Sequence, residues 1–149
     1  MAISSAICSS FKQELLQGKH SLDTSGNGGD TFKLAMYTSS ASLDATTTAY
    51  ATGNEISGSG YSAGGATLTN TGVGLTSTTA FTDFSDVSFT SASFTANGCL
   101  IYNTTTAGVS GTTNAVCVIA FGGDKTVSSG TFTIQFPTND SSSAIIRLT

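Results

Sequence analysis

Beyond residue 30, large apolar residues recur at every second position in several separate stretches of the chain. In residues 131–136, Phe and Ile alternate with Thr and Gln, and in residues 32–37 the alternating apolar residues are Phe32, Leu34 and Met36. A period of two is that of a β-strand, whose successive side chains point to opposite faces. The pattern therefore predicts strands with one buried face and restricts the chain to a β fold.

Two further stretches are apolar on both faces. Residues 99–102 and 115–121 contain almost no polar side chain. Such runs indicate central strands that are covered on both sides. Residues 104–114 between them are rich in Gly, Thr and Ser and predict a long hairpin loop, and residues 144–148 predict a last strand.

One short helix is expected near the N-terminus. Ser10 is a suitable N-cap with Gln13 at the capping-box position, and Gly18 is a suitable end. The apolar residues expected to share one face of this helix are Phe11, Leu15 and Leu16. About two turns are not stable in isolation, so the helix must dock on its own sandwich or on another subunit.

The middle of the chain, residues 39–79, has few large residues and allows two interpretations. It forms either a long loop excursion or a loop with short strands, such as one over residues 66–69. About eight to ten short strands predict an all-β fold, an antiparallel two-sheet β-sandwich or jelly roll with one short N-terminal helix. We expect residues 1–30 to form a helix and Gly-rich loop, as an arm or a docked segment. Residues 31–149 should form the β-sandwich domain.

The chain is poor in charge. Charged residues make up 9% of the 149 residues, with 5 Lys and Arg against 9 Asp and Glu and a net charge of −4. Nucleic-acid binding draws on clustered basic residues, so nucleic acid is a poor partner. The chain has no apolar run of the roughly 20 residues that span a membrane. The first residues lack the basic segment of a secretory signal, so we expect synthesis in the cytoplasm and no membrane partner.

The residues needed for an active site are nearly absent. His20 is the only histidine, and its place after the short helix predicts a solvated side chain. Asp83 and Asp86 are expected in capping or turn roles. No serine lies in a Gly-x-Ser-x-Gly elbow between a strand and a helix. The sequence therefore predicts a non-enzymatic protein without catalytic residues.

Candidate ligand-binding motifs also fail on their spacing. Residues 23–30 begin like a calcium loop, but Leu34 stands where the bidentate Glu is required, so a Gly-rich turn is predicted. Residues 122–126 resemble part of a phosphate loop, but no helix follows, and we expect a turn between strands. We therefore predict no metal and no cofactor.

The three cysteines also lack the spacing of a metal site. Cys8, Cys99 and Cys117 are odd in number and have no Cys-x-x-Cys pair. Cys99 and Cys117 lie in apolar runs, where a free thiol acts as a small core side chain. Free thiols are expected, with a bond between Cys99 and Cys117 left open as the alternative.

Several segments in order along most of the chain resemble those of a known family. They are residues 11–18, 32–38, 60–65, 80–84, 98–103, 121–126, 132–137 and 144–147. These segments resemble a family of small virion proteins of tailed bacteriophages, described as structural, head-decoration or tail proteins.

The resemblance implies a capsid decoration, or cement, protein that stabilises the shell without catalysing a reaction. Its implied partners are the major capsid protein and copies of itself, as a homotrimer, and its implied location is the virion. The candidate contacts are Phe11, Leu15 and Leu16 on the helix, together with residues 39–79. The alternative is a tail, fibre or baseplate component with a host-glycan site, for which Tyr50 and Tyr61 are the candidate residues.

Overall fold

A computed structural model describes residues 2–105 and 113–149 of the chain. Its elements in chain order are β1 (Ala6–Ile7), α1 (Ser9–Leu16), a 3-10 turn (Ser25–Asn27), β2 (Phe32–Tyr37), β3 (Ala66–Thr67), β4 (Asn70–Thr76), β5 (Thr79–Phe84), β6 (Val87–Asn103), β7 (Ala115–Ile134) and β8 (Ile146–Leu148). Most of the hairpin loop predicted at 104–114 lies outside the described residues.

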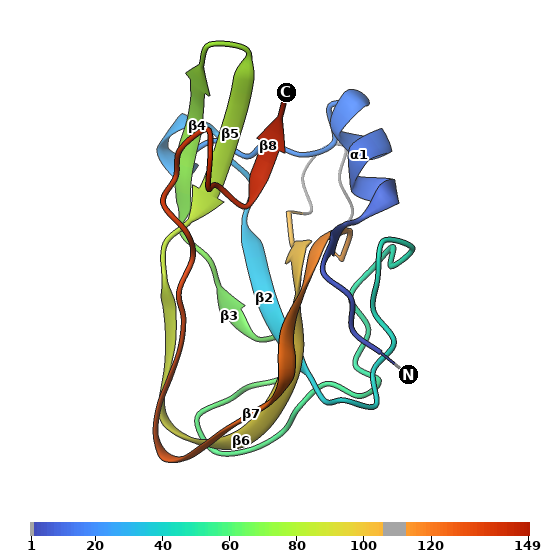
Figure 1. The fold of residues 1–149 in the computed structure, drawn as a ribbon, viewed down its shortest axis with the longest axis vertical. Coiled ribbons are helices and arrows are strands. Elements are labelled where there is room, and N and C mark those ends of the chain that lie inside the picture. The colour runs from blue at the N-terminus through green and yellow to red at the C-terminus, as the bar shows by residue number, and fades with distance from the viewer. Residues whose placement is uncertain (1, 106–112) are drawn as a thin grey trace.

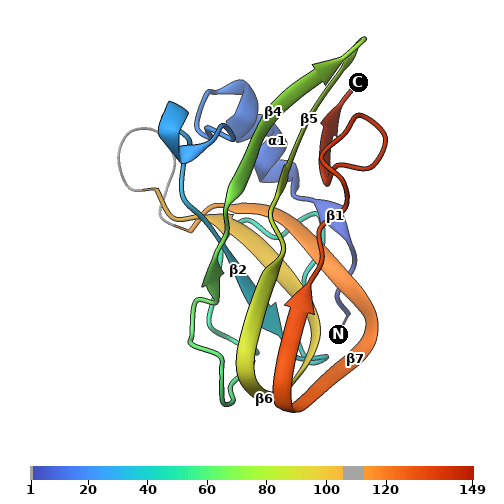
Figure 2. The same cartoon turned by 90° about the vertical axis from the view of Figure 1, so that its left-hand side faces the viewer.

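The strands form two antiparallel sheets. One has five strands in the order β1-β7-β6-β2-β3, and the other has three in the order β4-β5-β8. Within the described ranges α1 is the single α-helix, which confirms the all-β, sandwich-like fold with one short N-terminal helix. Figures 1 and 2 show that the three-stranded sheet and α1 lie at the same end of the molecule, with β6 and β7 curving away below them.

β6 and β7 pair along almost their whole length. Their register runs from Val87 opposite Ile134 to Tyr102 opposite Ala115. The turn predicted at residues 122–126 was wrong, because this stretch lies inside β7. Residues 121–124 form a bulge opposite Asn97 alone, and Lys125 and Thr126 pair with β6. Gly122 and Gly123 both have positive φ, the conformation that glycine permits. The strand then resumes its pairing with β6. The Gly-rich sequence that predicted a turn therefore forms a bulge.

The central runs are buried as predicted except at the end of the second, where residues 119–121 are half-buried. Residues 99–102 of β6 and 115–118 of β7 are all buried. Cys8, Cys99 and Cys117 are free and buried, which confirms the expectation of core thiols. The alternation over residues 131–136 is also confirmed by the burial pattern, although β7 ends at Ile134.

The expectation of a single buried face was wrong for β2. Ala35 and Tyr37, on the face predicted to be exposed, are buried as completely as Phe32. The reason is residues 38–65, which form a long loop over this strand. The Tyr37 hydroxyl donates to the carbonyl of Ala51 in that loop at 2.7 Å. β2 is therefore covered on both faces.

α1 differs from its prediction at the start and agrees at the end. Its N-cap is Cys8, and Ser10 lies inside the first turn with a buried hydroxyl that caps nothing. Gly18 has a φ of 71°, and its N–H donates to the carbonyl of Leu15 at 3.1 Å. The helix therefore ends on a left-handed glycine, as the sequence indicates.

The middle and the C-terminus combine the expected features at shorter length. Residues 38–65 form the predicted loop excursion, and β3 covers two of the residues expected at 66–69. β4 and β5 follow as a hairpin. The last strand begins at Ile146 rather than at residue 144. The N-terminal segment is docked, since β1 pairs with β7 in the larger sheet.

Candidate docking surface

The chemistry-bearing residues do not gather into a reactive site. Among the residues that the structure describes, no group of three His, Cys, Asp or Glu could hold a metal ion. Asp23 and Asp30, of the loop that begins like a calcium site, instead accept hydrogen bonds from the backbone N–H groups of Thr24 and Ser21. In the same part of the chain, no helix is long and apolar enough to cross a membrane.

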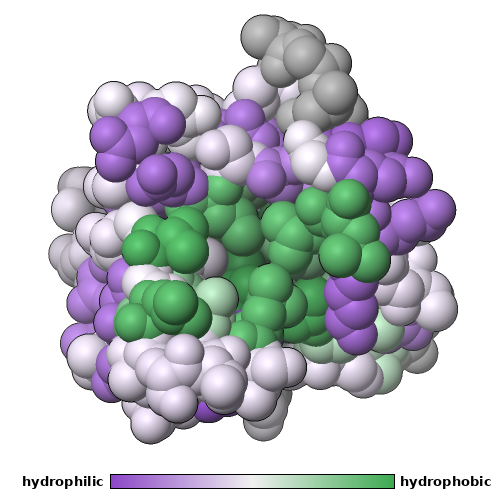
Figure 3. Space-filling model, turned by 90° about the horizontal axis from the view of Figure 1, so that it is seen from above, coloured by the Kyte–Doolittle hydropathy of each residue, from purple (hydrophilic) through white to green (hydrophobic). Residues whose placement is uncertain are grey.

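Large apolar side chains are exposed mainly at one end of the molecule. The exposed fractions are 92% for Leu16, 71% for Leu75, 57% for Val73 and 56% for Leu148. Figure 3, which looks onto this end, shows apolar side chains in two groups on either side of a hollow. We call this surface the apolar end and define it as Leu15, Leu16, Leu22, Val73, Leu75 and Leu148.

The register of the three-stranded sheet explains why its apolar residues share a face. Leu75 of β4 lies opposite Ala80 of β5, and Ala80 lies opposite Leu148 of β8. Val73 lies two residues before Leu75 and so points to the same side. One face of this small sheet is therefore apolar and only partly covered by the rest of the chain.

A groove separates this sheet from α1. Its volume is about 350 Å³, and its walls include Leu15 and Leu22 on one side and Val73, Ile146 and Leu148 on the other. Burying one such aliphatic side chain stabilises a contact by roughly 1.5–3 kcal/mol. The groove and its rim therefore offer a partner several apolar side chains that the chain itself leaves exposed.

A larger apolar cavity lies elsewhere in the sandwich. It has a volume of about 650 Å³ and lies between β1, β7 and the segment after β7, with Phe121, Phe132 and Phe136 among its walls. These three rings are half-buried. The four large apolar residues that are most exposed lie at the apolar end instead, and we therefore take the apolar end as the candidate site.

The structure separates the three helix residues that were predicted to form one contact face. Phe11 is 1% exposed and lies in the core, so it is not available to a partner, which corrects that prediction. Leu15 lines the groove, and Leu16 points into solvent. The helix packs on its own sandwich through Phe11 and adds only Leu15 and Leu16 to the apolar end.

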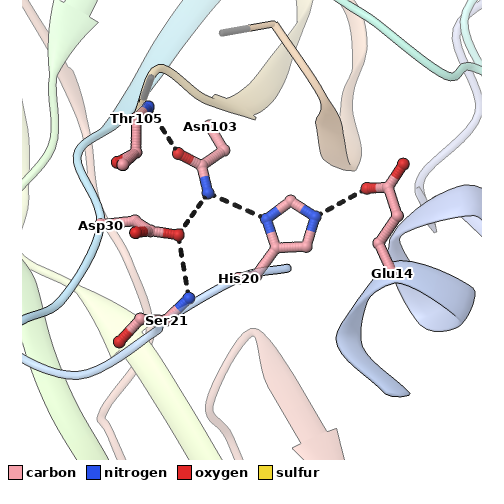
Figure 4. A network of polar contacts seen from close by, with 6 residues as sticks. All are labelled: Glu14, His20, Ser21, Asp30, Asn103 and Thr105. Atoms are coloured by element: carbon pink, nitrogen blue, oxygen red, sulfur yellow. Dashed lines mark hydrogen bonds and ion pairs between the residues drawn. The ribbon is translucent and has the colours of Figure 1, made fainter. Parts of the chain in front are cut away.

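His20 was predicted to be solvated, and this was wrong. Its side chain is fully buried beneath the apolar end and lies between Glu14 of α1 and Asn103 of β6 (Figure 4). The Phe11 ring packs against it with a centroid distance of 4.9 Å. Burial is possible because both ring nitrogens have hydrogen-bond partners.

Tyr50 and Tyr61 are brought together, but around a carboxylate. Both hydroxyls donate to Glu55, at 2.7 Å and 2.6 Å, and the Gly64 N–H donates to it at 2.7 Å. The Tyr50 ring stacks on Tyr102. Both tyrosines are half-buried, and their hydroxyls bind within the chain and hold the loop 38–65 in place.

Sequence reasoning assigned no buried or site role to Glu55 or Asn103. The importance of Glu55 could have been recognised from its isolation. It is the only charged residue in residues 45–82 and has a tyrosine on either side in the sequence. Asn103 follows a buried apolar run, where an amide needs hydrogen-bond partners.

Comparison with protein-family models, with curated proteins and with solved structures finds no match to this chain.

Proposed function

We propose that this chain is a non-enzymatic structural protein of a bacteriophage particle, a capsid decoration protein that docks on the major capsid protein through its apolar end. The observation that carries the proposal is the concentration of exposed Leu16, Val73, Leu75 and Leu148 on one small surface. Exposed apolar patches of this kind are typical of protein contact sites. The resemblance to phage virion proteins supplies the identity of the partner.

Docking would stabilise a shell by adding contact area between neighbouring capsid subunits. Each contact is small, but many copies on one shell hold it together through repetition. A net charge of −4 on 149 residues keeps the repulsion between neighbouring copies low. The low charge thus supports close packing of many copies on one surface.

Binding to purified shells tests the proposal. Wild-type protein should bind expanded shells of the major capsid protein saturably in a sedimentation assay. The double variant Leu16→Gln, Leu75→Gln should bind at least about tenfold more weakly, because it places amide groups where apolar side chains would be buried. Thr131→Gln is the matched control, since Thr131 is exposed on β7 and lies outside the apolar end.

The location of the protein in the intact particle decides between head and tail. Symmetric density outside the capsid shell in an electron-microscopy map supports the proposal. Density confined to the tail would overturn it in favour of a tail, fibre or baseplate component. Equal binding of the double variant and of wild type would overturn the role of the apolar end.

We also propose that the shell-bound form is a homotrimer. Closed cyclic assembly is the usual way for identical subunits to cover exposed surfaces. Sedimentation equilibrium of the purified protein measures the mass of its assembly directly. A monomeric mass at all concentrations, together with a lack of threefold density on the shell, would contradict the trimer.

A further inference from the structure

His20 connects α1 to the end of β6. Nε2 lies 2.7 Å from a carboxylate oxygen of Glu14 on α1, and Nδ1 lies 2.9 Å from the amide nitrogen of Asn103 on β6. Figure 4 shows the imidazole between these two side chains. Its side chain is fully buried, so water does not replace either contact. The histidine is therefore a direct polar link between the helix and the larger sheet.

The orientation of the Asn103 amide follows from its other two partners. The Thr105 N–H donates to its oxygen at 2.8 Å, and its nitrogen donates to Asp30 at 2.7 Å. Asp30 also accepts the Ser21 N–H at 2.9 Å, as a carboxylate does. Turning the amide over would place its oxygen against this carboxylate and its NH₂ against another N–H. The nitrogen of Asn103 therefore faces His20.

This orientation assigns the protons of His20. The Asn103 nitrogen carries two hydrogens, of which one goes to Asp30 and the other to Nδ1 of His20. Nδ1 must then accept and carries no hydrogen, so the hydrogen of the neutral ring is on Nε2. Nε2 donates to Glu14. The geometry thus selects a single neutral tautomer.

A second proton on the His20 ring can bind only at Nδ1. There it would face the N–H of Asn103, and two donors in contact repel each other. The charged groups near the ring are Glu14 on α1, Lys19 beside it in the chain, and Asp23 and Asp30 in the following loop.

The other neighbours of the ring are uncharged. The rings of Phe11 on α1 and Phe32 on β2 pack near it, and Thr82 on β5 and Ile146 on β8 line the groove with it. Protonation therefore strengthens the contact to Glu14 on the helix side and breaks the contact to Asn103 on the sheet side.

We infer that His20 is a proton-operated latch, which holds α1 against β6 while neutral and releases the helix when Nδ1 is protonated. Because Glu14 and His20 stay together, the helix and the histidine move as a unit away from Asn103. Leu15 and Leu16 move with the helix, so the groove loses Leu15 from its wall. The inference concerns the free protein and holds whether or not the apolar end docks on a shell.

Nuclear magnetic resonance of the full chain tests the tautomer without any mutation. The chain has one histidine, so labelling histidine with ¹⁵N reports on His20 alone. The spectrum of the neutral ring should show its hydrogen on Nε2. A neutral ring with its hydrogen on Nδ1 would overturn the inference.

Hydrogen exchange on acidification tests the release. When the pH is lowered until the ¹⁵N signals of His20 report the charged ring, the protection of α1 amides should fall by about tenfold, the factor for one buried hydrogen bond. Each rate is corrected for the intrinsic pH dependence of exchange, and amides of β7 serve as the internal reference. Unchanged protection of α1 while the His20 signal titrates would overturn the latch.

His20→Gln provides the matched variant. A glutamine amide can donate to Glu14 and accept from Asn103 but does not take up a proton as imidazole does. Protection of α1 in His20→Gln should therefore be independent of pH. A pH dependence equal to that of wild type would assign the effect to another group, such as the buried Asp83, and would contradict the latch.

Discussion

The hydroxyl of Tyr61 lies 2.6 Å from the carboxylate of Glu55 and accepts the backbone N–H of Met36 at 2.9 Å. It therefore links the loop 38–65 to β2 through one oxygen atom. Burial, and then the hydrogen bond to the Glu55 carboxylate, raises the pKa of Tyr61. The hydroxyl therefore stays protonated at neutral pH.

Tyr61→Phe should lower the free energy of unfolding by about 1–3 kcal/mol, because it leaves the Met36 N–H without a partner in the protein interior. Tyr50→Phe is the control, since it loses one bond to Glu55 and keeps its stacking on Tyr102. Its expected cost is about 0.5–1.5 kcal/mol. Urea unfolding measures both, and a larger cost for Tyr50→Phe would contradict the assignment.

Gly65 and Gly122 have the same φ of 75° but different surroundings. A β-carbon on Gly65 would lie 1.7 Å from the carbonyl oxygen of Leu34, whereas one on Gly122 would have nothing within 4 Å. Gly122→Ala should cost about 1 kcal/mol for the left-handed backbone alone. Gly65→Ala should cost about 3 kcal/mol or more, because the backbone must also move. Equal thermal stability of the two variants would show that the loop adapts freely.

Asp83 and Asp140 should have opposite effects on the pH dependence of stability. Burial raises the pKa of Asp83, whereas hydrogen bonds from the backbone N–H groups of Ser142 and Ser143 lower that of Asp140. The stabilising contribution of Asp83 is therefore full below the ordinary aspartate pKa of about 3.9 and is lost as the pH rises through its raised value. That of Asp140 is present above about pH 3.9 and is lost as the pH falls through its lowered value.

Unfolding measurements from about pH 3 to about pH 7 compare wild type with Asp83→Asn and with Asp140→Asn. The stability of wild type relative to Asp83→Asn should fall as the pH rises, and that relative to Asp140→Asn should rise. Slopes of the same sign would contradict the two assignments. Asp83 was expected in a capping or turn role, but it is buried on β5 and accepts the N–H of Ile145 before β8.

The three thiols should not react in the native protein. Burial is the main cause that raises the pKa of Cys8, to about 11, and burial also raises the pKa values of Cys99 and Cys117. A thiol reacts as the thiolate, so a thiol reagent at about pH 8 should modify none of them until the chain unfolds. Ser85→Cys, at an exposed position, is the positive control. Rapid modification of native wild type would contradict the burial.

The fold class could be predicted because it depends on local periodicity. Local patterns indicate which faces of a strand are buried. Examples are the alternation in residues 131–136 and the continuous apolar runs at 99–102 and 115–121. The end of α1 was also readable, since Gly18 takes a conformation that few other residues adopt. These features need no knowledge of distant parts of the chain.

The errors arose where a distant residue determined the outcome. His20 is buried because Asn103, 83 residues away in the chain, supplies its second hydrogen bond. The outer face of β2 is buried because Glu55 and its tyrosines hold a loop over it. For Phe11 and Leu16, the helix pattern gave the apolar residues but not which of them faces the sandwich. Tertiary contacts overrode the local signal in each case.

The pairing of β1 with β7 has a consequence for the order of events during synthesis. Ala6 lies opposite Val118, so β1 leaves the ribosome well before the strand with which it pairs. β6 and β7 are close in the chain and can pair as soon as β7 has emerged. β1 can join the sheet only after that hairpin exists. β1 is therefore made before β7 but joins the sheet after it.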